Sequence, residues 1–178
     1  MKVGIAKVNL TPEMPVTIDG FASRIGKLSE GVAHDIYANC AVLDNGETRV
    51  CIMGLDVLAV DDYLLVPVRQ AAEKLGIPAA NVMLNTSHGH ASPNVTPCRS
   101  FMRSYEDEYL EATREKLCEV MAAAVDDLAE ARLDYTVGSC ALGLNRRGRD
   151  GLWENPAKSI DLDVPVLRVT SPENELRG

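Results

Sequence analysis

Two of the three histidines in this 178-residue chain, His88 and His90, are separated by a single residue in the stretch LNTSHGHASPNV. Side chains of an extended backbone alternate with a period of two, so both imidazoles would point to the same side and could share one site. Neutral imidazole is a good zinc ligand, and a catalytic zinc usually takes about three protein ligands plus water. The spacing therefore raises two interpretations, a metal site and a loop that carries two histidines by chance.

Three further residues could assist such a site. Asp56 directly follows the apolar run 50–55, and it is either a third metal ligand or a cap for the next loop or helix. His34 precedes Asp35 and either orients a ligand or belongs to a solvated turn. Arg146 has a guanidinium group that can hold a carboxylate, a phosphate or a developing oxyanion through two hydrogen bonds, although most such arginines are simply solvated.

Strands and helices must position these residues. The pattern predicts a first strand over 2–10 and a hairpin over 37–56, whose two apolar runs are joined through Asn45 and Gly46. Such a pair tolerates the positive φ of a tight hairpin turn. The second run, 50–55, is apolar at nearly every position, which is typical of a strand covered on both faces.

A helix and another strand follow the hairpin. Apolar residues recur with helical spacing over 64–75, and Asp61 or Asp62 is placed to cap this helix. The run NVMLNT at 81–86 then predicts a short buried strand. The order of strand, helix and strand favours a parallel βαβ crossover, in which the residues after both strands meet at the same edge of the sheet.

The second half of the chain predicts one long helix and two more strands. Ser104 and Asp107 have the spacing of a capping box, and the helix that they open runs to about Ala131. Strands are expected over 135–143 and 163–169. The predicted class is α/β, with a mixed β-sheet flanked by helices that is parallel at the crossover and antiparallel at the hairpin.

Composition narrows the function classes. The formal net charge is -8 and the pI is near 4.9, which disfavours binding to nucleic acid or to an anionic membrane surface. Aromatic residues make up only 4% of the chain, too few for a platform on which bases stack. No nucleic-acid partner is therefore expected.

The cysteines, the apolar runs and the first residues bear on the location of the protein in the cell. Five scattered cysteines without a CxxC pair suit a reducing compartment, and no apolar run approaches the roughly 20 residues that span a bilayer. The first residues do not have the pattern of a signal peptide. We expect a protein without a transmembrane segment that is cytoplasmic, or secreted if a leader was removed.

Four segments in order resemble the N-terminal part of the neutral/alkaline non-lysosomal ceramidase family. They are VGIAKVNLTP, GVAHDIYANCAVLDNGETRVCIMGLDVL, GIPAANVMLNTSHGHASP and GLNRRG, within a resemblance that runs from about Val3 to Val169. The resemblance implies a zinc-dependent hydrolase in which a metal-bound water attacks the amide carbonyl of an N-acyl sphingoid base or a related small-molecule or lipid N-acyl amide.

The resemblance also implies roles for individual residues. His88 would be a Zn²⁺ ligand, and His90 would lie beside the metal and stabilise or protonate the reacting groups. Arg146 would line the active site and hold the oxyanion. Because the family's other zinc ligands lie beyond the matched part, the resemblance implies an incomplete catalytic domain over residues 1–178.

Two other functions remain open at this stage. One is a non-catalytic α/β module that self-associates through an open sheet edge. The other is a metal-dependent phosphoesterase, with Asp56, His88 and His90 around the ion and Arg146 on the phosphate.

Overall fold

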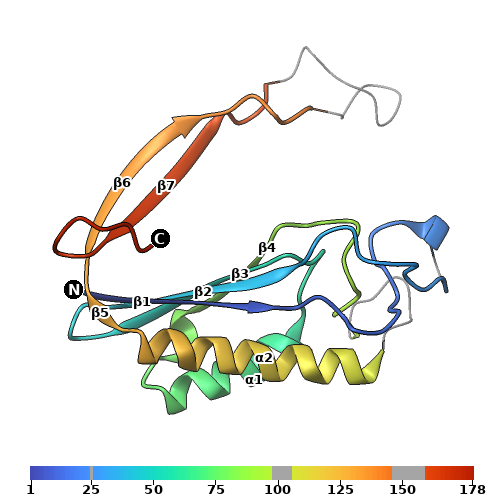
Figure 1. Ribbon diagram of the computed structural model, residues 1–178, viewed down its shortest axis with the longest axis horizontal. Helices are drawn as coiled ribbons and strands as arrows, with labels where there is room; N and C mark the ends of the chain where they lie inside the picture. The colour runs from blue at the N-terminus through green and yellow to red at the C-terminus, as the bar shows by residue number, and fades with distance from the viewer. Residues whose placement is uncertain (25, 98–105, 146–158) are drawn as a thin grey trace. The chain divides into compact units, whose positions relative to one another are not determined.

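The computed structural model describes residues 1–24, 26–97, 106–145 and 159–178. Contacts divide the chain into two compact units, Met1–Glu130 and Ala131–Gly178. The first unit contains both helices and the larger sheet (Figure 1). The expectation of one incomplete catalytic domain over residues 1–178 stays a prediction.

A five-stranded mixed sheet organises the first unit, in the order β4-β3-β2-β1-β5. Only β3 and β4 are parallel, and the other neighbouring strands are antiparallel. The predicted α/β class with a mixed sheet and flanking helices is thereby confirmed. The strands are β1 (Lys2–Asn9), β2 (Tyr37–Asp44), β3 (Arg49–Leu55), β4 (Val82–Thr86) and β5 (Ala129–Glu130).

The β2–β3 hairpin forms where the sequence predicts it, but its turn is longer than a tight two-residue turn. Asp44 pairs with Arg49, so residues 45–48 form the loop. Gly46 takes the positive φ of 89°, while the Asn45 side chain accepts a 2.9 Å hydrogen bond from the Thr48 backbone N–H. A 2.8 Å hydrogen bond from Arg49 lowers the pKa of Asp44 and closes the base of the loop.

Helix α1 (Asp62–Lys74) connects β3 to β4 as the predicted crossover. The Asp61 carboxylate caps it by accepting a 3.0 Å hydrogen bond from the Tyr63 backbone N–H. Pro67 lies inside the helix, and Gly76, with a φ of 72°, follows its end. A short 3-10 helix, η2 (Ala79–Asn81), directly precedes β4.

Helix α2 (Asp107–Asp126) is shorter than the sequence predicts. It ends before Ala131 because β5 leaves the helical path and pairs with the start of β1 at Lys2 and Val3. Glu106 is its N-cap residue, and the expected capping residue Ser104 lies outside the described residues.

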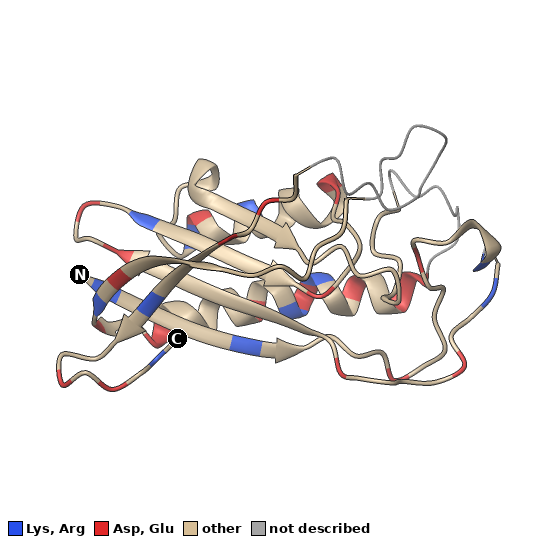
Figure 2. Ribbon diagram, turned by 90° about the horizontal axis from the view of Figure 1, so that it is seen from above, with Lys and Arg blue, Asp and Glu red and all other residues tan. Residues whose placement is uncertain are grey.

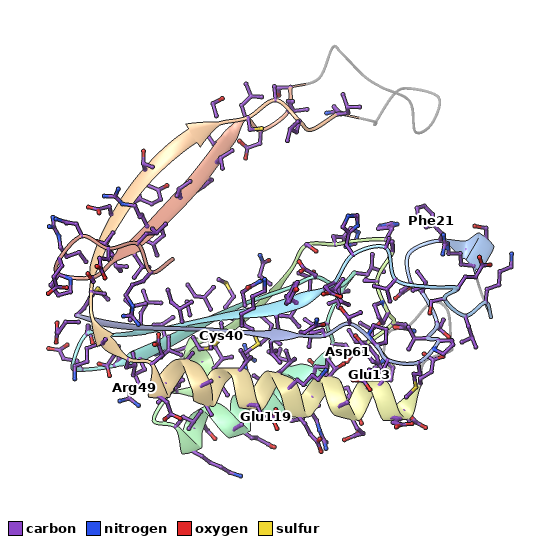
Figure 3. All side chains as sticks on the ribbon, in the orientation of Figure 1. Glu13, Phe21, Cys40, Arg49, Asp61 and Glu119 are labelled. Carbon is purple, nitrogen blue, oxygen red and sulfur yellow. The ribbon has the colours of Figure 1, made fainter. Side chains whose placement is uncertain are left out.

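Both helices pack on the same face of the sheet (Figure 1). Burial therefore alternates along β3, and the prediction that this strand is covered on both faces is wrong: Cys51, Met53 and Leu55 are buried, whereas Val50 is 36% exposed. The buried thiols of Cys40 and Cys51 lie 3.6 Å apart, and Figure 3 shows Cys40 between the sheet and the helices. The contact with Cys51 and burial raise the pKa of the Cys40 thiol.

The second unit is built on a long antiparallel hairpin of β6 (Arg132–Ser139) and β7 (Asp163–Thr170). Arg168 and Asp134 form a cross-strand ion pair of 2.9 Å, and this hydrogen bond lowers the pKa of Asp134. The last residues turn back onto β7, where the Val169 N–H donates to the Gly178 carbonyl. The strands expected over 135–143 and 163–169 are thus present with shifted bounds.

In the part of the chain that the structure describes, acidic and basic positions are interspersed over strands, helices and loops (Figure 2). Among the described residues, neither helix combines the length and the apolar character needed to cross a bilayer.

We predict that Gly4→Ala severely destabilises the first unit. A Cβ at Gly4 would lie 1.8 Å from the Ala124 carbonyl oxygen of α2, and helix backbone cannot move aside as a flexible side chain can. The expected loss in the free energy of unfolding is at least about 3 kcal/mol, measured by urea denaturation. Gly54→Ala in β3 is the matched control, because a Cβ there meets nothing within 4 Å. Equal stability of the two variants would contradict this account of helix packing.

Candidate functional site

The two histidines lie in the loop that follows β4, at the end of the parallel strand pair. The Ser87 N–H donates to the Leu55 carbonyl at 3.0 Å, which continues the β3–β4 pairing into this loop. His88 Nδ1 lies 2.9 Å from the Leu58 carbonyl oxygen. A carbonyl only accepts hydrogen bonds, so Nδ1 carries the proton. The Nε2 lone pair of His88 is then available to a metal or a substrate, in the arrangement common among metal-binding histidines.

The two imidazoles adjoin each other, although the backbone between them is not extended. His88 has a φ of 57°, in the left-handed region that few residues other than glycine adopt. The ring centroids of His88 and His90 lie 5.0 Å apart with an angle of 71° between their planes. The expected extended backbone is therefore wrong, and a local turn at His88 brings the two rings next to each other.

His90 is fixed on its other side by residues that follow the first strand. The Phe21 ring contacts the His90 ring edge-on, with 5.0 Å between centroids, and Figure 3 labels this residue at the end of the unit. Gly20 has a φ of 103°, and a Cβ there would lie 2.7 Å from Cγ of His90. Only glycine therefore satisfies both the backbone conformation and the space beside the imidazole.

Residues 10–20, which we call the 10–20 segment, pair with the histidine loop. The Asp19 N–H donates to the Ser92 carbonyl at 3.0 Å, and the Asn94 N–H donates to the Thr17 carbonyl at 2.9 Å. Between these bonds, Ile18 forms an isolated antiparallel bridge with the residue after Ser92. The pairing holds the 10–20 segment and the histidine loop in register.

Helix α2 anchors the 10–20 segment from the opposite side. The Glu106 carboxylate accepts hydrogen bonds of 2.8 Å from both the backbone N–H and the hydroxyl of Thr17, which is buried. The Tyr109 hydroxyl donates to the Leu10 carbonyl at 2.7 Å, and burial raises the pKa of Tyr109 to about 12, so the hydroxyl keeps its proton at neutral pH. The segment that contacts His90 is thus tied to the start of α2.

The other candidate residues have different surroundings. The Asp56 carboxylate accepts a 3.0 Å hydrogen bond from the Tyr37 backbone N–H at the start of β2. It therefore closes the end of the β2–β3 pair, and this bond does not cap the following loop or helix as the sequence interpretation expected. His34 is exposed in a loop, and the neighbouring Asp35 bonds Thr11 and Tyr37. Arg146 lies outside the described residues.

As possible metal ligands, the described residues therefore bring two imidazoles together, those of His88 and His90. In this part of the chain, no three side chains of His, Cys, Asp or Glu are grouped so that they could hold a metal ion. The interpretation of Asp56 as a third ligand beside His88 and His90 is wrong for the described arrangement. Among the described residues of this site, the Nε2 of His88 is the group that could hold a metal ion, with the ring of His90 next to it.

Sequence reasoning missed Gly20, Phe21 and Glu106 as parts of this site. None of them belongs to a motif with the histidines, and Thr17 and Glu106 are 89 residues apart in the chain. The sequence carried one weak signal, the glycine of TIDGF in a segment without periodicity. Such a glycine marks a special backbone conformation without indicating which residue it faces.

No family model and no curated protein matches this sequence. Several solved structures share its fold, among them the following two. One is described as a ceramidase complexed with C2, with a TM-score of 0.83 and 18% identity over 98% of this chain and 29% of that chain. The other is the neutral ceramidase from Pseudomonas aeruginosa, with a TM-score of 0.80 and 19% identity over 98% of this chain and 30% of that chain.

These two structures confirm, at the level of the fold, the resemblance to neutral ceramidases that the four sequence segments indicate. The described chain has the fold of part of a neutral ceramidase. It spans less than a third of the length of either neighbour.

We predict that Gly20→Ala displaces the His90 ring. The new methyl group would overlap the imidazole, and alanine is strained at a φ of 103°, so a loss of about 1–3 kcal/mol in the free energy of unfolding is expected. NMR should show loss of the contacts between the His90 and Phe21 rings. Gly89→Ala is the control within the same loop, since its Cβ would have 3.8 Å to the nearest atom, the Ser87 hydroxyl oxygen. A His90 environment that is identical in both variants would refute the proposed fit.

Proposed function

We propose that this protein is part of a zinc-dependent hydrolase that cleaves an N-acyl amide bond. The observation that carries the proposal is the hydrogen bond from His88 Nδ1 to the Leu58 carbonyl, which leaves the Nε2 lone pair of His88 for a ligand, with the His90 ring 5.0 Å away between centroids. The fold shared with neutral ceramidases supports amide hydrolysis as the reaction class. A small or lipid N-acyl amide is the substrate that we propose.

Each residue has a defined task in this proposal. His88 would hold the metal through Nε2, and the Leu58 carbonyl would keep its ring oriented and its Nδ1 protonated. Bound zinc would supply Lewis-acid polarisation of the amide carbonyl and a lowered pKa of water. His90, held between Phe21 and His88, would donate a proton to the amine that leaves. Arg146 would hold the developing oxyanion.

Zinc binding by His88 gives the first test. Equilibrium dialysis with metal analysis should show weak zinc binding by the parent protein, since the described residues supply two imidazoles where a catalytic site usually has about three protein ligands. His88→Ala should abolish this binding. His34→Ala is the control, because it removes an exposed histidine from another loop. Equal zinc content in the parent and in His88→Ala would show that His88 is not a zinc ligand.

The reaction class needs a separate assay. N-acyl amides and phosphate monoesters should be compared as substrates of the protein, with and without added zinc. We expect turnover of the amides alone, and its loss in Arg146→Ala. Turnover of phosphate esters alone would favour the phosphoesterase alternative instead.

Self-association through the sheet is a second candidate function. β4 is an edge strand of the described sheet, and such an edge can pair with a further strand. Beside this edge, Met83 is 53% exposed and Val50 is 36% exposed on the face opposite the helices. Both features suit a second copy of the chain.

The cytoplasmic location expected from the sequence stays a prediction.

Sedimentation velocity tests this second candidate. We expect a dimer of the parent protein that weakens by about tenfold in Met83→Glu, because a charge would be buried between the copies. Val66→Glu is the control, since Val66 is exposed to a similar extent, 46%, on helix α1. A monomer at all concentrations, or equal dimerisation of the two variants, would rule out this surface.

A further inference from the structure

Three sulfur-bearing side chains share the face of the larger sheet that the helices cover. Cys40 lies on β2, while Cys51 and Met53 lie two residues apart on β3 and therefore point to the same side. All three are buried. The two thiol sulfurs are 3.6 Å apart. Cys40 pairs with Met53 in the β2–β3 register, and Cβ atoms of such partners lie about 4.5–5.5 Å apart. Two thiols and one thioether are thus within reach of one another.

The placement of the two cysteines in the sheet does not suit a disulfide. Cys40 is opposite Met53, whereas Cys51 is opposite Val42, so the two cysteines are diagonal neighbours. Cα atoms of diagonal neighbours lie about 7–8 Å apart. A disulfide usually needs a Cα separation of about 4.4–6.8 Å. A direct bond between the two sulfurs would therefore require the strands to move.

The separation of the two thiols suits an ion held between them. Two sulfur ligands at about 2.3 Å from one metal lie about 3.8–4.0 Å from each other in tetrahedral or trigonal geometry. The observed 3.6 Å needs only a small widening to reach this range. Thiolate and thioether sulfurs are soft ligands, and among biological metals they select Cu⁺. Met53 would supply the thioether as a third ligand from the same buried face.

We propose that Cys40, Cys51 and Met53 form a binding site for a soft monovalent cation of the Cu⁺ type. As the ion binds, one thiol releases its proton to solvent, and the resulting thiolate cancels the single charge of the ion. The complex is then neutral, which matters because a net charge in an apolar core is costly. A divalent ion bound in the same way would leave one buried positive charge. The site uses no residue of the histidine loop, and it does not depend on the proposed function.

Anaerobic titration of the protein with Cu⁺, in competition with a coloured Cu⁺ chelator, tests the inference. The parent should bind one ion tightly, and X-ray absorption at the copper edge should show sulfur neighbours and no nitrogen. Cys40→Ala and Cys51→Ala should each weaken this binding at least about 100-fold, because loss of even an outer-shell partner costs about 10–100-fold. Met53→Leu keeps the volume of the core, and loss of its thioether should weaken binding about tenfold.

Three matched variants control for other copper ligands. Cys118→Ala and Cys140→Ala remove thiols outside the site, and His88→Ala removes an imidazole of the histidine loop. All three should keep the parent's affinity for Cu⁺. Urea denaturation checks that each variant folds, and Met53→Leu remains a test even if the cysteine variants do not. The inference would be overturned by a parent that binds no ion tightly, by nitrogen ligands in the absorption spectrum, or by equal affinity of Met53→Leu and the parent.

Discussion

Parallel pairing of β3 with β4 is the constraint on which the site depends. It brings the ends of both strands to the same edge of the sheet, so that the loop after β3 supplies the Leu58 carbonyl and the loop after β4 supplies His88. The same carbonyl also accepts a 3.3 Å hydrogen bond from the Thr86 hydroxyl. One backbone oxygen thus orients the last residue of β4 and the first histidine together. Without the crossover through α1, neither the ring orientation nor the protonated nitrogen of His88 would be defined.

A second layer of contacts comes from the 10–20 segment. This segment has little regular structure, yet it touches the histidine loop on one side and α2 on the other. Glu106 satisfies two donors of Thr17 at once, and a carboxylate that accepts two hydrogen bonds in a partly buried place holds its partner firmly. The same segment supplies Gly20 beside His90 and part of the wall of a cavity that it forms with residues 29–36. The histidines and the cavity therefore share one support.

Many of the strands and helices could be predicted, because the hydrophobic period and the capping residues that specify them lie within or next to each element. The first strand, the hairpin, the Asp61 cap of α1 and the crossover all follow from such signals. The end of α2 could not, since pairing of Ala129 and Glu130 with β1 overrides the helical pattern. In the site, the neighbouring histidines were evident from their spacing. Their contacts with Phe21 and Gly20 depend on pairing between distant loops, which leaves no periodic trace in the sequence.

The hydrogen bonds between Thr17 and Glu106 have a consequence for the order in which the protein folds. They join residues 89 positions apart, so their formation closes a long loop of chain and must follow the local elements. During synthesis the two histidines emerge before the helix that secures the 10–20 segment behind them. We therefore expect the hairpin and the crossover to form before the surroundings of His90 are assembled. On this order of events, the contacts that hold His90 are completed late, with the docking of α2.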